Sequence, residues 1–258
     1  ILIGDDPASK SYVSQKRKWA EFIGAKITIL HYPTSITTEE IQKKIYELNN
    51  NSTNYATLIQ RPVPPHIDIK ELELLINPQK DIDGFHPASP YTFPLALAVV
   101  KILEEIRFCH SREGDASQKL VPLRYGNLAP PSYKIVVLGK GPTGGGSIIK
   151  YLRELGFHPT LIDSKTENPD ELTKKADIII SAVGKPNIIT PQNIKKGVTL
   201  IGVGIARDDD GKLHGDYNEE NIKNLAAFYT PTPGGVGPVN VAMLLYNLIE
   251  ATKEQIKN

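Results

Sequence analysis

The first part of the chain contains a tyrosine and a lysine whose spacing would let them act together. Tyr12 and Lys16 stand four residues apart in a stretch of helical period, so their side chains project from one helix face. A lysine amine in such a place could transfer protons. Exposed lysines are usually only solvated, but the turn over residues 4–9 follows an apolar strand end, where parallel sheets bind ligands. The pair is therefore a candidate catalytic face.

Two further polar side chains and one loop could contribute to the same ligand site. Gln60 ends another apolar run and is followed by a proline-rich turn over residues 61–65. Asp83 lies in the loop 80–87, where the composition alone supports no more than a turn former beside glycine. The Pro- and Gly-rich stretch 230–238 either reverses the chain or brings bare backbone against a flat ligand. The pattern alone leaves these two alternatives open.

The second half of the chain contains a glycine pattern typical of dinucleotide binding. Gly139, Gly141 and Gly144 form G-x-G-x-x-G directly after a predicted strand and before a predicted helix. The first glycine allows a tight turn, the second lets a pyrophosphate approach the backbone, and the third lets helix and strand pack closely. Free amides at the helix N-terminus would then face the phosphates. Asp163, at the end of the next strand, strengthens this prediction.

The residues around Asp163 give opposing signals about which dinucleotide binds. An acidic side chain there accepts hydrogen bonds from a ribose 2′-hydroxyl and repels a 2′-phosphate, which favours NAD. Lys140, Ser164 and Lys165 stand beside it and could hold a 2′-phosphate. The sequence therefore leaves NAD and NADP as alternatives.

Strands and helices must alternate along nearly the whole chain to position these residues. Such an alternation predicts an α/β fold with parallel sheets, and Ser9 is the expected N-cap of the first helix. We expect strands over residues 1–3, 26–32, 55–60, 134–139, 160–163, 177–181 and 199–203, and helices over residues 9–23, 38–49, 67–76, 94–106, 144–155, 170–175 and 239–257.

The length of 258 residues and an irregular stretch in the middle predict two domains. We place the boundary within residues 111–132, which are rich in Pro, Gly and charge. Residues 1–110 would form a catalytic domain and residues 111–238 a Rossmann-type dinucleotide-binding domain. The last helix, within residues 239–258, would pack back on the first domain. The ligand site would then be a cleft between the two domains.

Composition excludes several classes of function. The 30 basic and 29 acidic residues leave a net charge of +1, which gives no electrostatic reason to expect nucleic acid or an anionic membrane as a partner. A single cysteine, Cys109, excludes an internal disulfide, and the six histidines show no metal-ligand spacing. No apolar run approaches the ~20 residues of a membrane helix. With no signal peptide visible, we expect a cytoplasmic protein, and the apolar start without methionine suggests residues upstream of Ile1.

Several motifs together resemble the bifunctional methylenetetrahydrofolate dehydrogenase/cyclohydrolase family. They span nearly the whole chain in the order that the family has. The matching segments are GDDPASKSYVSQK (4–16), Gln60 with its proline-rich turn, KDIDGFHP (80–87), ADIIISAVGKP (176–186), VGI (203–205) followed by HGD (214–216), and TPTPGGVGP (230–238).

The resemblance implies a role for each candidate. It implies that Lys16 is the catalytic lysine, that Gln60 hydrogen-bonds and tunes it, and that Asp83 holds the pterin ring of the folate. It implies that Tyr12 stacks on the aminobenzoyl ring and that the loop 233–235 lines folate and nicotinamide. The implied substrate-binding residues are Tyr12, Pro233, Gly234 and Gly235, and the implied cofactor-binding residues are Gly139, Lys140, Gly141, Gly144, Asp163, Ser164, Lys165, Gly184, Gly204 and Ile205.

The implied activity is the oxidation of 5,10-methylenetetrahydrofolate with NAD(P), followed by hydrolysis to 10-formyltetrahydrofolate, in a homodimeric enzyme of one-carbon metabolism. The family implies NADP. This chain departs from the family pattern where Lys140 replaces an arginine and Asp163 a residue that is commonly histidine, and the stretch after Pro87 is shorter. Two alternatives follow: a monofunctional NAD-dependent dehydrogenase, and a non-catalytic protein that binds folate or nucleotide.

Overall fold

The computed structural model describes residues 1–110, 133–207 and 211–257. By its internal contacts the chain divides into two compact units, Ile1–Pro94 with Val241–Asn258, and Leu95–Asn240. The domain boundary expected within residues 111–132 lies outside the described residues. In the part of the chain that is described, no helix is long and apolar enough to cross a membrane.

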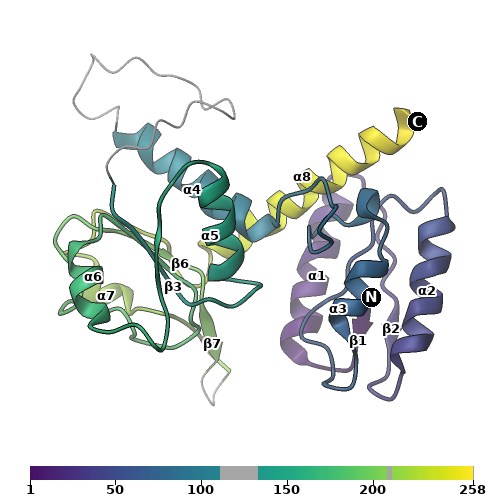
Figure 1. The fold of residues 1–258 in the computed structure, drawn as a ribbon, viewed down its shortest axis with the longest axis horizontal. Helices are drawn as coiled ribbons and strands as arrows, with labels where there is room; N and C mark the ends of the chain where they lie inside the picture. Colours follow the sequence, from purple (N-terminus) through teal and green to yellow (C-terminus); the bar gives the residue numbers. More distant parts are fainter. Residues whose placement is uncertain (111–132, 208–210, 258) are drawn as a thin grey trace. The chain divides into compact units, whose positions relative to one another are not determined.

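The first unit is an α/β unit with a short parallel sheet. Strands β1 and β2 pair in parallel, and helices α1 and α2 lie on opposite sides of the pair in Figure 1. Isoleucines dominate the core between these elements, with Ile41 and Ile45 of α2 fully buried. The elements are β1 (Leu2–Ile3), α1 (Pro7–Phe22), β2 (His31–Tyr32), α2 (Thr38–Asn50), α3 (Ile69–Leu75) and the 3₁₀ turn η1 (Pro78–Lys80).

Helix α1 begins before the residue that we predicted as its cap. Asp6 is the N-cap, and its carboxylate accepts a hydrogen bond from the backbone N–H of Ser9 at 2.7 Å. Pro7 follows as the first helical residue, where its missing N–H costs nothing and its fixed φ suits a helix. The prediction of Ser9 as cap was therefore wrong, because an Asp-Pro start outcompetes a serine within the first turn.

The extended segments of the first unit are shorter than the sequence predicted. Of the expected strand 26–32, only His31–Tyr32 pairs with β1. Residues 55–60 form no regular strand, although Gln60 donates its backbone N–H to the carbonyl of Ile1 at 2.9 Å. This run is apolar because its side chains, such as that of Ile59, are buried. A buried segment need not pair with a neighbouring strand along its whole length. The hydrogen bond to Ile1 nonetheless places Gln60 beside β1.

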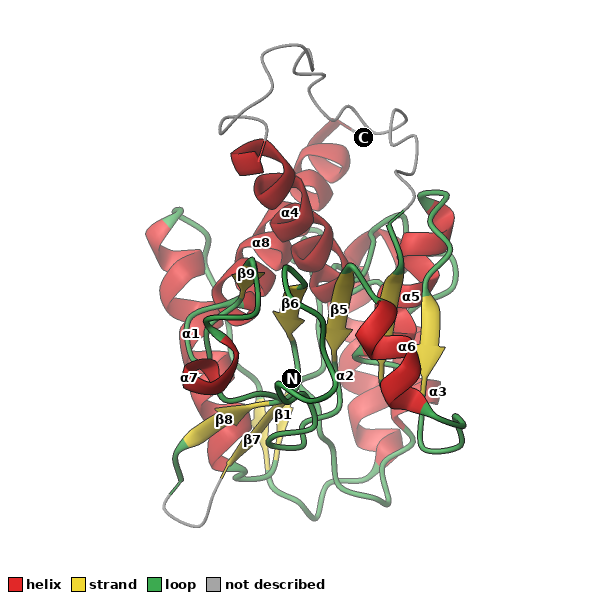
Figure 2. Cartoon of the chain, turned by 90° about the vertical axis from the view of Figure 1, so that its left-hand side faces the viewer, coloured by secondary structure: helices red, strands yellow, loops and turns green. Residues whose placement is uncertain are grey.

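The second unit contains a five-stranded parallel sheet with the order β4-β3-β5-β6-β9. The arrows of β5 and β6 point the same way in Figure 2, and a separate antiparallel pair, β7 and β8, lies beyond them. The strands are β3 (Ile135–Leu138), β4 (Thr160–Ile162), β5 (Ile178–Ser181), β6 (Thr199–Gly202), β7 (Ile205–Arg207), β8 (Leu213–Gly215) and β9 (Phe228–Tyr229), and the helices are α4 (Pro94–His110), α5 (Gly145–Glu154), α6 (Pro169–Lys175) and α7 (Glu219–Ile222).

The strand order places a topological switch at β3. The chain leaves β3 toward β4 on one side and later returns to β5 on the other side. At such a point the connections at the carboxyl ends of the strands diverge, and open parallel sheets bind their ligands there. The prediction of a Rossmann-type α/β sheet is therefore confirmed, with the glycine loop directly after β3.

The last helix, α8 (Val236–Lys257), completes the first unit from Val241 onward. Val241 and Leu245 pack against Ala20 of α1. Asn247 is buried and donates from Nδ2 to the carbonyls of Ile82 at 2.8 Å and Thr92 at 2.9 Å. Ile82 directly precedes Asp83 in the chain, so α8 helps to hold the loop that carries this candidate.

Candidate functional site

The first unit brings Lys16 and Gln60 into direct contact. Nζ of Lys16 donates to Oε1 of Gln60 at 3.2 Å, and it lies 5.7 Å from the ring centroid of Tyr12. Helix α1 carries the tyrosine and the lysine one turn apart, while Gln60 comes from the segment beside β1. All three side chains are partly buried. The amine is therefore held by an amide oxygen and lies over an aromatic ring.

The amide of Gln60 is oriented by its own neighbour. Its Nε2 donates to the backbone carbonyl of Arg61 at 2.7 Å, so that Oε1 remains to face Lys16. A flipped amide would instead place its N–H₂ group against the ammonium. No hydrogen bond could then form, because both groups are donors. The orientation of Gln60 thus depends on the position of Arg61.

Asp83 stands in a turn that is organised by the buried Asp81. The carboxylate of Asp81 accepts the N–H of His86 at 2.7 Å, and its carbonyl accepts the Ser89 hydroxyl at 2.8 Å. Gly84 has φ +70°, and a Cβ there would lie 2.4 Å from the carbonyl oxygen of Tyr91. Only glycine fits this position, and the partly exposed Asp83 precedes it.

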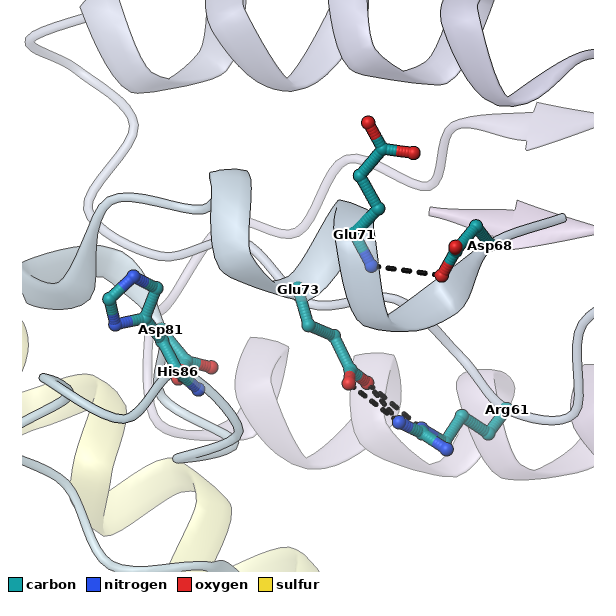
Figure 3. A network of polar contacts seen from close by, with 6 residues as sticks. All are labelled: Arg61, Asp68, Glu71, Glu73, Asp81 and His86. Atoms are coloured by element: carbon teal, nitrogen blue, oxygen red, sulfur yellow. Dashed lines mark hydrogen bonds and ion pairs between the residues drawn. The ribbon is translucent and has the colours of Figure 1, made fainter.

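Burial raises the pKa of the Asp81 carboxyl to about 6. The hydrogen bond from His86 opposes this shift, while the charge of Asp83 adds to it. Figure 3 shows Asp81 beside His86, with the ion pair of Arg61 and Glu73 in the same region. Burial also raises the pKa of Glu73, the bonds and the charge of Arg61 lower it, and the charge of Asp83 adds a smaller upward effect. The charge of Asp83 therefore acts on Asp81 and on Glu73, the partner of Arg61.

The glycine loop of the second unit forms a tight turn with room for an anion. Gly139 has φ +94°, and a Cβ there would lie 2.5 Å from the carbonyl oxygen of Ala182. A Cβ on Gly141 would meet nothing within 4 Å, which leaves space for a ligand beside the backbone. Gly144 caps α5 without any side-chain hydrogen bond. The first amides of α5 are thus not capped by a side chain, as a pyrophosphate site requires.

Close packing of helix against strand depends on Gly145, one residue after the predicted glycine. A Cβ on Gly145 would lie 1.9 Å from the carbonyl oxygen of Gly139, whereas one on Gly144 would make an ordinary 3.5 Å contact with Ala182. The motif pattern does not distinguish the two, because the run Gly144–Gly146 contains three glycines in succession.

Asp163 and Lys140 form one ion pair instead of acting separately. Nζ of Lys140 donates to Oδ2 of Asp163 at 2.8 Å, and the backbone N–H of Lys165 donates to Oδ1 at 2.9 Å. The bond from Lys140 is the largest of the effects that lower the pKa of Asp163 to about 2. Lys140 is about half exposed, and Ser164 and Lys165 are exposed beside it. The four predicted residues therefore meet at the carboxyl end of β4.

Asp216 is a functional candidate that sequence reasoning missed. It is completely buried. Its Oδ2 accepts the Ser181 hydroxyl at 2.6 Å and the N–H of Val183 at 3.0 Å, and its Oδ1 accepts the N–H of Lys185 at 2.8 Å. The side chain therefore fixes the loop that follows β5. Its only signal in the sequence was its place in the HGD triplet.

The predicted residues Gly184, Gly204 and Ile205 meet around this aspartate. A Cβ on Gly204 would lie 2.3 Å from both Oδ2 of Asp216 and the backbone N of Gly184. A Cβ on Gly184, which has φ +68°, would lie 3.1 Å from the carbonyl oxygen of Ile205. The side chain of Ile205 is exposed. The loops after β5 and β6 thus come together where the switch point predicts a ligand.

The Pro- and Gly-rich loop follows β9 in the second unit. A Cβ on Gly235 would lie 2.5 Å from the carbonyl oxygen of Pro231. Thr232 donates its backbone N–H to Glu219 at 2.7 Å. Pro233 and Gly234 are exposed. The loop is therefore tightly folded at its base and presents bare backbone at its tip.

Among the described residues, no group of three or more His, Cys, Asp and Glu side chains is placed to hold a metal ion.

Both parts of the chain match known families of proteins. Residues 1–83 match the family described as tetrahydrofolate dehydrogenase/cyclohydrolase, catalytic domain. Residues 123–256 match the family described as tetrahydrofolate dehydrogenase/cyclohydrolase, NAD(P)-binding domain. The bifunctional protein FolD of Staphylococcus epidermidis is 35% identical over 254 residues, which cover 98% of this chain and 85% of that protein.

Solved structures show the same similarity. The bifunctional enzyme FolD, a methylenetetrahydrofolate dehydrogenase/cyclohydrolase from Campylobacter jejuni, has a TM-score of 0.85 and 31% identity, covering 98% of this chain and 86% of that chain. The Trypanosoma brucei enzyme, solved with NADP and an inhibitor, has a TM-score of 0.85 and 28% identity, covering 100% of this chain and 86% of that chain.

Proposed function

The chain belongs to the tetrahydrofolate dehydrogenase/cyclohydrolase family, and from this premise we propose that it catalyses both reactions of that name. It oxidises 5,10-methylenetetrahydrofolate with a nicotinamide dinucleotide and hydrolyses the product to 10-formyltetrahydrofolate. The observation that carries the proposal is the contact of 3.2 Å between Nζ of Lys16 and Oε1 of Gln60 beside the ring of Tyr12. An amine held in this way is suited to proton transfer.

The two reactions make different demands on the protein. In the first, a hydride leaves the carbon that bridges N5 and N10 of the folate and reduces the nicotinamide ring, so the protein has only to bind and orient the two molecules. In the second, water adds to the methenyl carbon and loses a proton. The bond from this carbon to N5 then breaks, and N5 takes up a proton. Lys16 is placed to move these protons, and Gln60 to hold the amine.

The remaining residues of the first unit would bind the folate. The carboxylate of Asp83 can accept two N–H bonds from a pterin ring, which fixes the plane of the ring. Tyr12 offers an aromatic face to the aminobenzoyl group. We assign these roles from the position of each residue in the family motifs and from the partial exposure of both side chains.

The dinucleotide would bind the second unit at the carboxyl ends of β3, β5 and β6. The open space beside Gly141 and the start of α5, which no side chain caps, suit a pyrophosphate. Gly184, Gly204 and Ile205 would line the nicotinamide half, together with the exposed Pro233 and Gly234 and the partly buried Gly235. When bound, the cofactor supplies the hydride chemistry, and the chain supplies its orientation.

We assign NADP as the physiological dinucleotide. The family of the second unit is described as NAD(P)-binding, and the Trypanosoma brucei relative was solved with NADP. The ammonium of Lys140 is about half exposed, so it can turn from Asp163 to a 2′-phosphate while the N–H of Lys165 continues to hold Asp163. NAD remains the second candidate, since Asp163 can accept hydrogen bonds from a free ribose 2′-hydroxyl.

A direct assay tests both activities. The purified chain would be supplied with methylenetetrahydrofolate and either NAD or NADP, and the formation of reduced nicotinamide and loss of methenyltetrahydrofolate would be followed separately. We expect Lys16→Met to abolish the hydrolysis while the protein remains folded. A folded Lys16→Met variant with the full rate of ring opening would contradict the role of Lys16, and a chain that binds folate but reduces neither dinucleotide would contradict the dehydrogenase.

The family also supports a cytoplasmic homodimer, and we propose both. Sedimentation of the purified protein at micromolar concentration tests the assembly, and a monomer under these conditions would contradict it. Fractionation of the cells that produce it tests the location.

A further inference from the structure

The residue after Gln60 carries a side chain for which sequence analysis assigned no role. Arg61 donates from Nε and Nη2 to Oε1 of Glu73 at 2.9 and 2.6 Å, and from Nη2 to Oε2 at 2.6 Å. Figure 3 shows this ion pair between the turn and helix α3. Glu73 is buried, and a buried carboxylate is stable only when it is paired. The guanidinium is therefore locked in one position.

From this position Arg61 contacts both sides of the proposed folate site. Its carbonyl accepts the bond of 2.7 Å that orients the amide of Gln60. Its guanidinium lies over the ring of Phe85, 4.6 Å from the centroid, and that ring packs against Phe93 at 5.0 Å. Phe85 follows Asp83 by two residues, on the far side of the Gly84 turn.

Charge gives the arginine a second effect on this region. The charge of Asp83 adds a smaller effect to that of burial at the carboxylates of both Glu73 and Asp81. Arg61 supplies the positive charge that pairs with Glu73, and its planar fork satisfies both oxygens of that carboxylate. A lysine would retain the charge but would lose the fork and the stacking on Phe85.

We propose that Arg61, held by Glu73, is a positioning residue that fixes Gln60 and the Asp83 turn relative to each other. This inference rests on the proposed function, in which Gln60 acts on the amine and Asp83 holds the pterin. Without the fork, the guanidinium would leave the ring of Phe85, and the two sides of the site would move independently. Displacements of about 1 Å at a reacting centre can cost up to a hundredfold in rate.

Two variants and a matched control test this proposal. Arg61→Lys keeps the charge, and Glu73→Gln keeps the shape of the partner while weakening the pair. We expect each to reduce kcat/KM for methylenetetrahydrofolate by about ten- to a hundredfold, with an unchanged KM for the dinucleotide. Glu71→Gln is the control, because Glu71 lies on the same helix but bonds to Gln42 of α2 at 2.7 Å. It should retain the kinetics of the parent protein.

A purely structural role for the pair would give a different result. It would lower the melting temperature of both variants but leave the kinetic constants of the folded fraction unchanged, and this outcome would overturn the proposal. NMR of the ligand-free protein gives a second measurement, independent of activity. We expect the Gln60 side-chain amide and the Gly84 backbone amide to shift together in Arg61→Lys and to stay in place in Glu71→Gln.

The two measurements also separate this inference from the proposed function. If the parent protein has neither folate activity, the proposed function fails, and the NMR result still decides whether Arg61 couples the two segments. If the parent protein is active and neither the kinetics nor the amide signals of Arg61→Lys change, the positioning role alone is wrong.

Discussion

Lys16 and Gln60 meet across 44 residues of sequence, with Nζ of the lysine 3.2 Å from the amide oxygen of the glutamine. The amide oxygen of Gln60 is neutral, so it can accept a hydrogen bond from either the charged ammonium or the neutral amine. A carboxylate in its place would favour the charged ammonium and would disfavour the neutral amine that accepts a proton. The chemical character of residue 60 should therefore affect the hydrolysis more than the hydride transfer.

Gln60→Glu tests this expectation. We expect a loss of ring-opening rate on the order of 10²-fold, the scale of a general acid–base contribution, with a smaller change in the dehydrogenase rate. Gln192→Glu, at an exposed position of the second unit, is a control for the added charge. Equal losses in both reactions would indicate that Gln60 serves folate binding alone.

Lys80 supports the same region by capping a helix. Its buried ammonium donates to the carbonyls of Leu48, Asn49 and Asn51 at 3.0, 2.8 and 2.8 Å, and burial lowers its pKa. The carbonyls at the end of α2 have no intrahelical partners. We expect Lys80→Met to lower the free energy of unfolding by about 2–3 kcal/mol, as for loss of hydrogen bonds to a charged group.

Urea unfolding would measure this change in the free energy of unfolding. Lys70→Met, at an exposed position of α3, is the control and should change stability little. A Lys80→Met variant as stable as the control would show that water replaces the ammonium at the end of α2.

Asp81 predicts a pH dependence of stability. Its pKa is raised in the folded chain from 3.8 to about 6, so the folded state binds the proton more tightly than the unfolded state. The stabilisation is complete below pH 3.8 and is lost as the pH rises through about 6. For a shift of this size the loss is roughly 2–3 kcal/mol.

The comparison with Asp81→Asn isolates this group, because an asparagine oxygen can still accept the N–H of His86. The free energy of unfolding of the parent protein relative to the variant should fall between pH 4 and pH 7, as followed by urea titrations at several pH values. A difference that is constant over this range would mean that Asp81 titrates as an ordinary carboxyl.

The alternation of strands and helices was predictable because buried parallel strands and amphipathic helices leave periods in the sequence. The strands β7, β8 and β9 were not, since these short strands are largely exposed or half-buried and form no continuous apolar run. Lys16 and Gln60 could be named from their motifs, but their contact depends on tertiary packing. Arg61 and Glu73 gave no signal, because an ion pair between a turn and a helix has no characteristic spacing.

The pair formed by Lys140 and Asp163 predicts how the cofactor is chosen. Replacing Lys140 with glutamine removes the cation that would bind a 2′-phosphate and frees the carboxylate to repel it. We expect Lys140→Gln to shift the ratio of kcat/KM from NADP toward NAD by about tenfold, or 1.4 kcal/mol. Lys150→Gln, on the exposed face of α5, is the control. An unchanged ratio would place the 2′-phosphate on other groups.

Asp216 predicts an effect on dinucleotide binding from a buried side chain that faces three donors. Its two oxygens accept the Ser181 hydroxyl and the N–H groups of Val183 and Lys185. An asparagine has only one acceptor oxygen, so its N–H₂ group would face a donor and displace the loop after β5. We expect Asp216→Asn to raise the dissociation constant for the dinucleotide about tenfold, the scale of one buried donor left without an acceptor, which calorimetry would measure.

Two comparisons show whether the effect of Asp216→Asn is confined to dinucleotide binding. The first is Asp170→Asn, a substitution at an exposed position of α6, which should leave dinucleotide binding unchanged. Hydrolysis of added methenyltetrahydrofolate needs no dinucleotide, so Asp216→Asn should retain its rate if the first unit is intact. A variant that loses both activities in proportion would show that Asp216 maintains the whole fold, whereas selective loss of dinucleotide binding would assign it to the loop that follows β5.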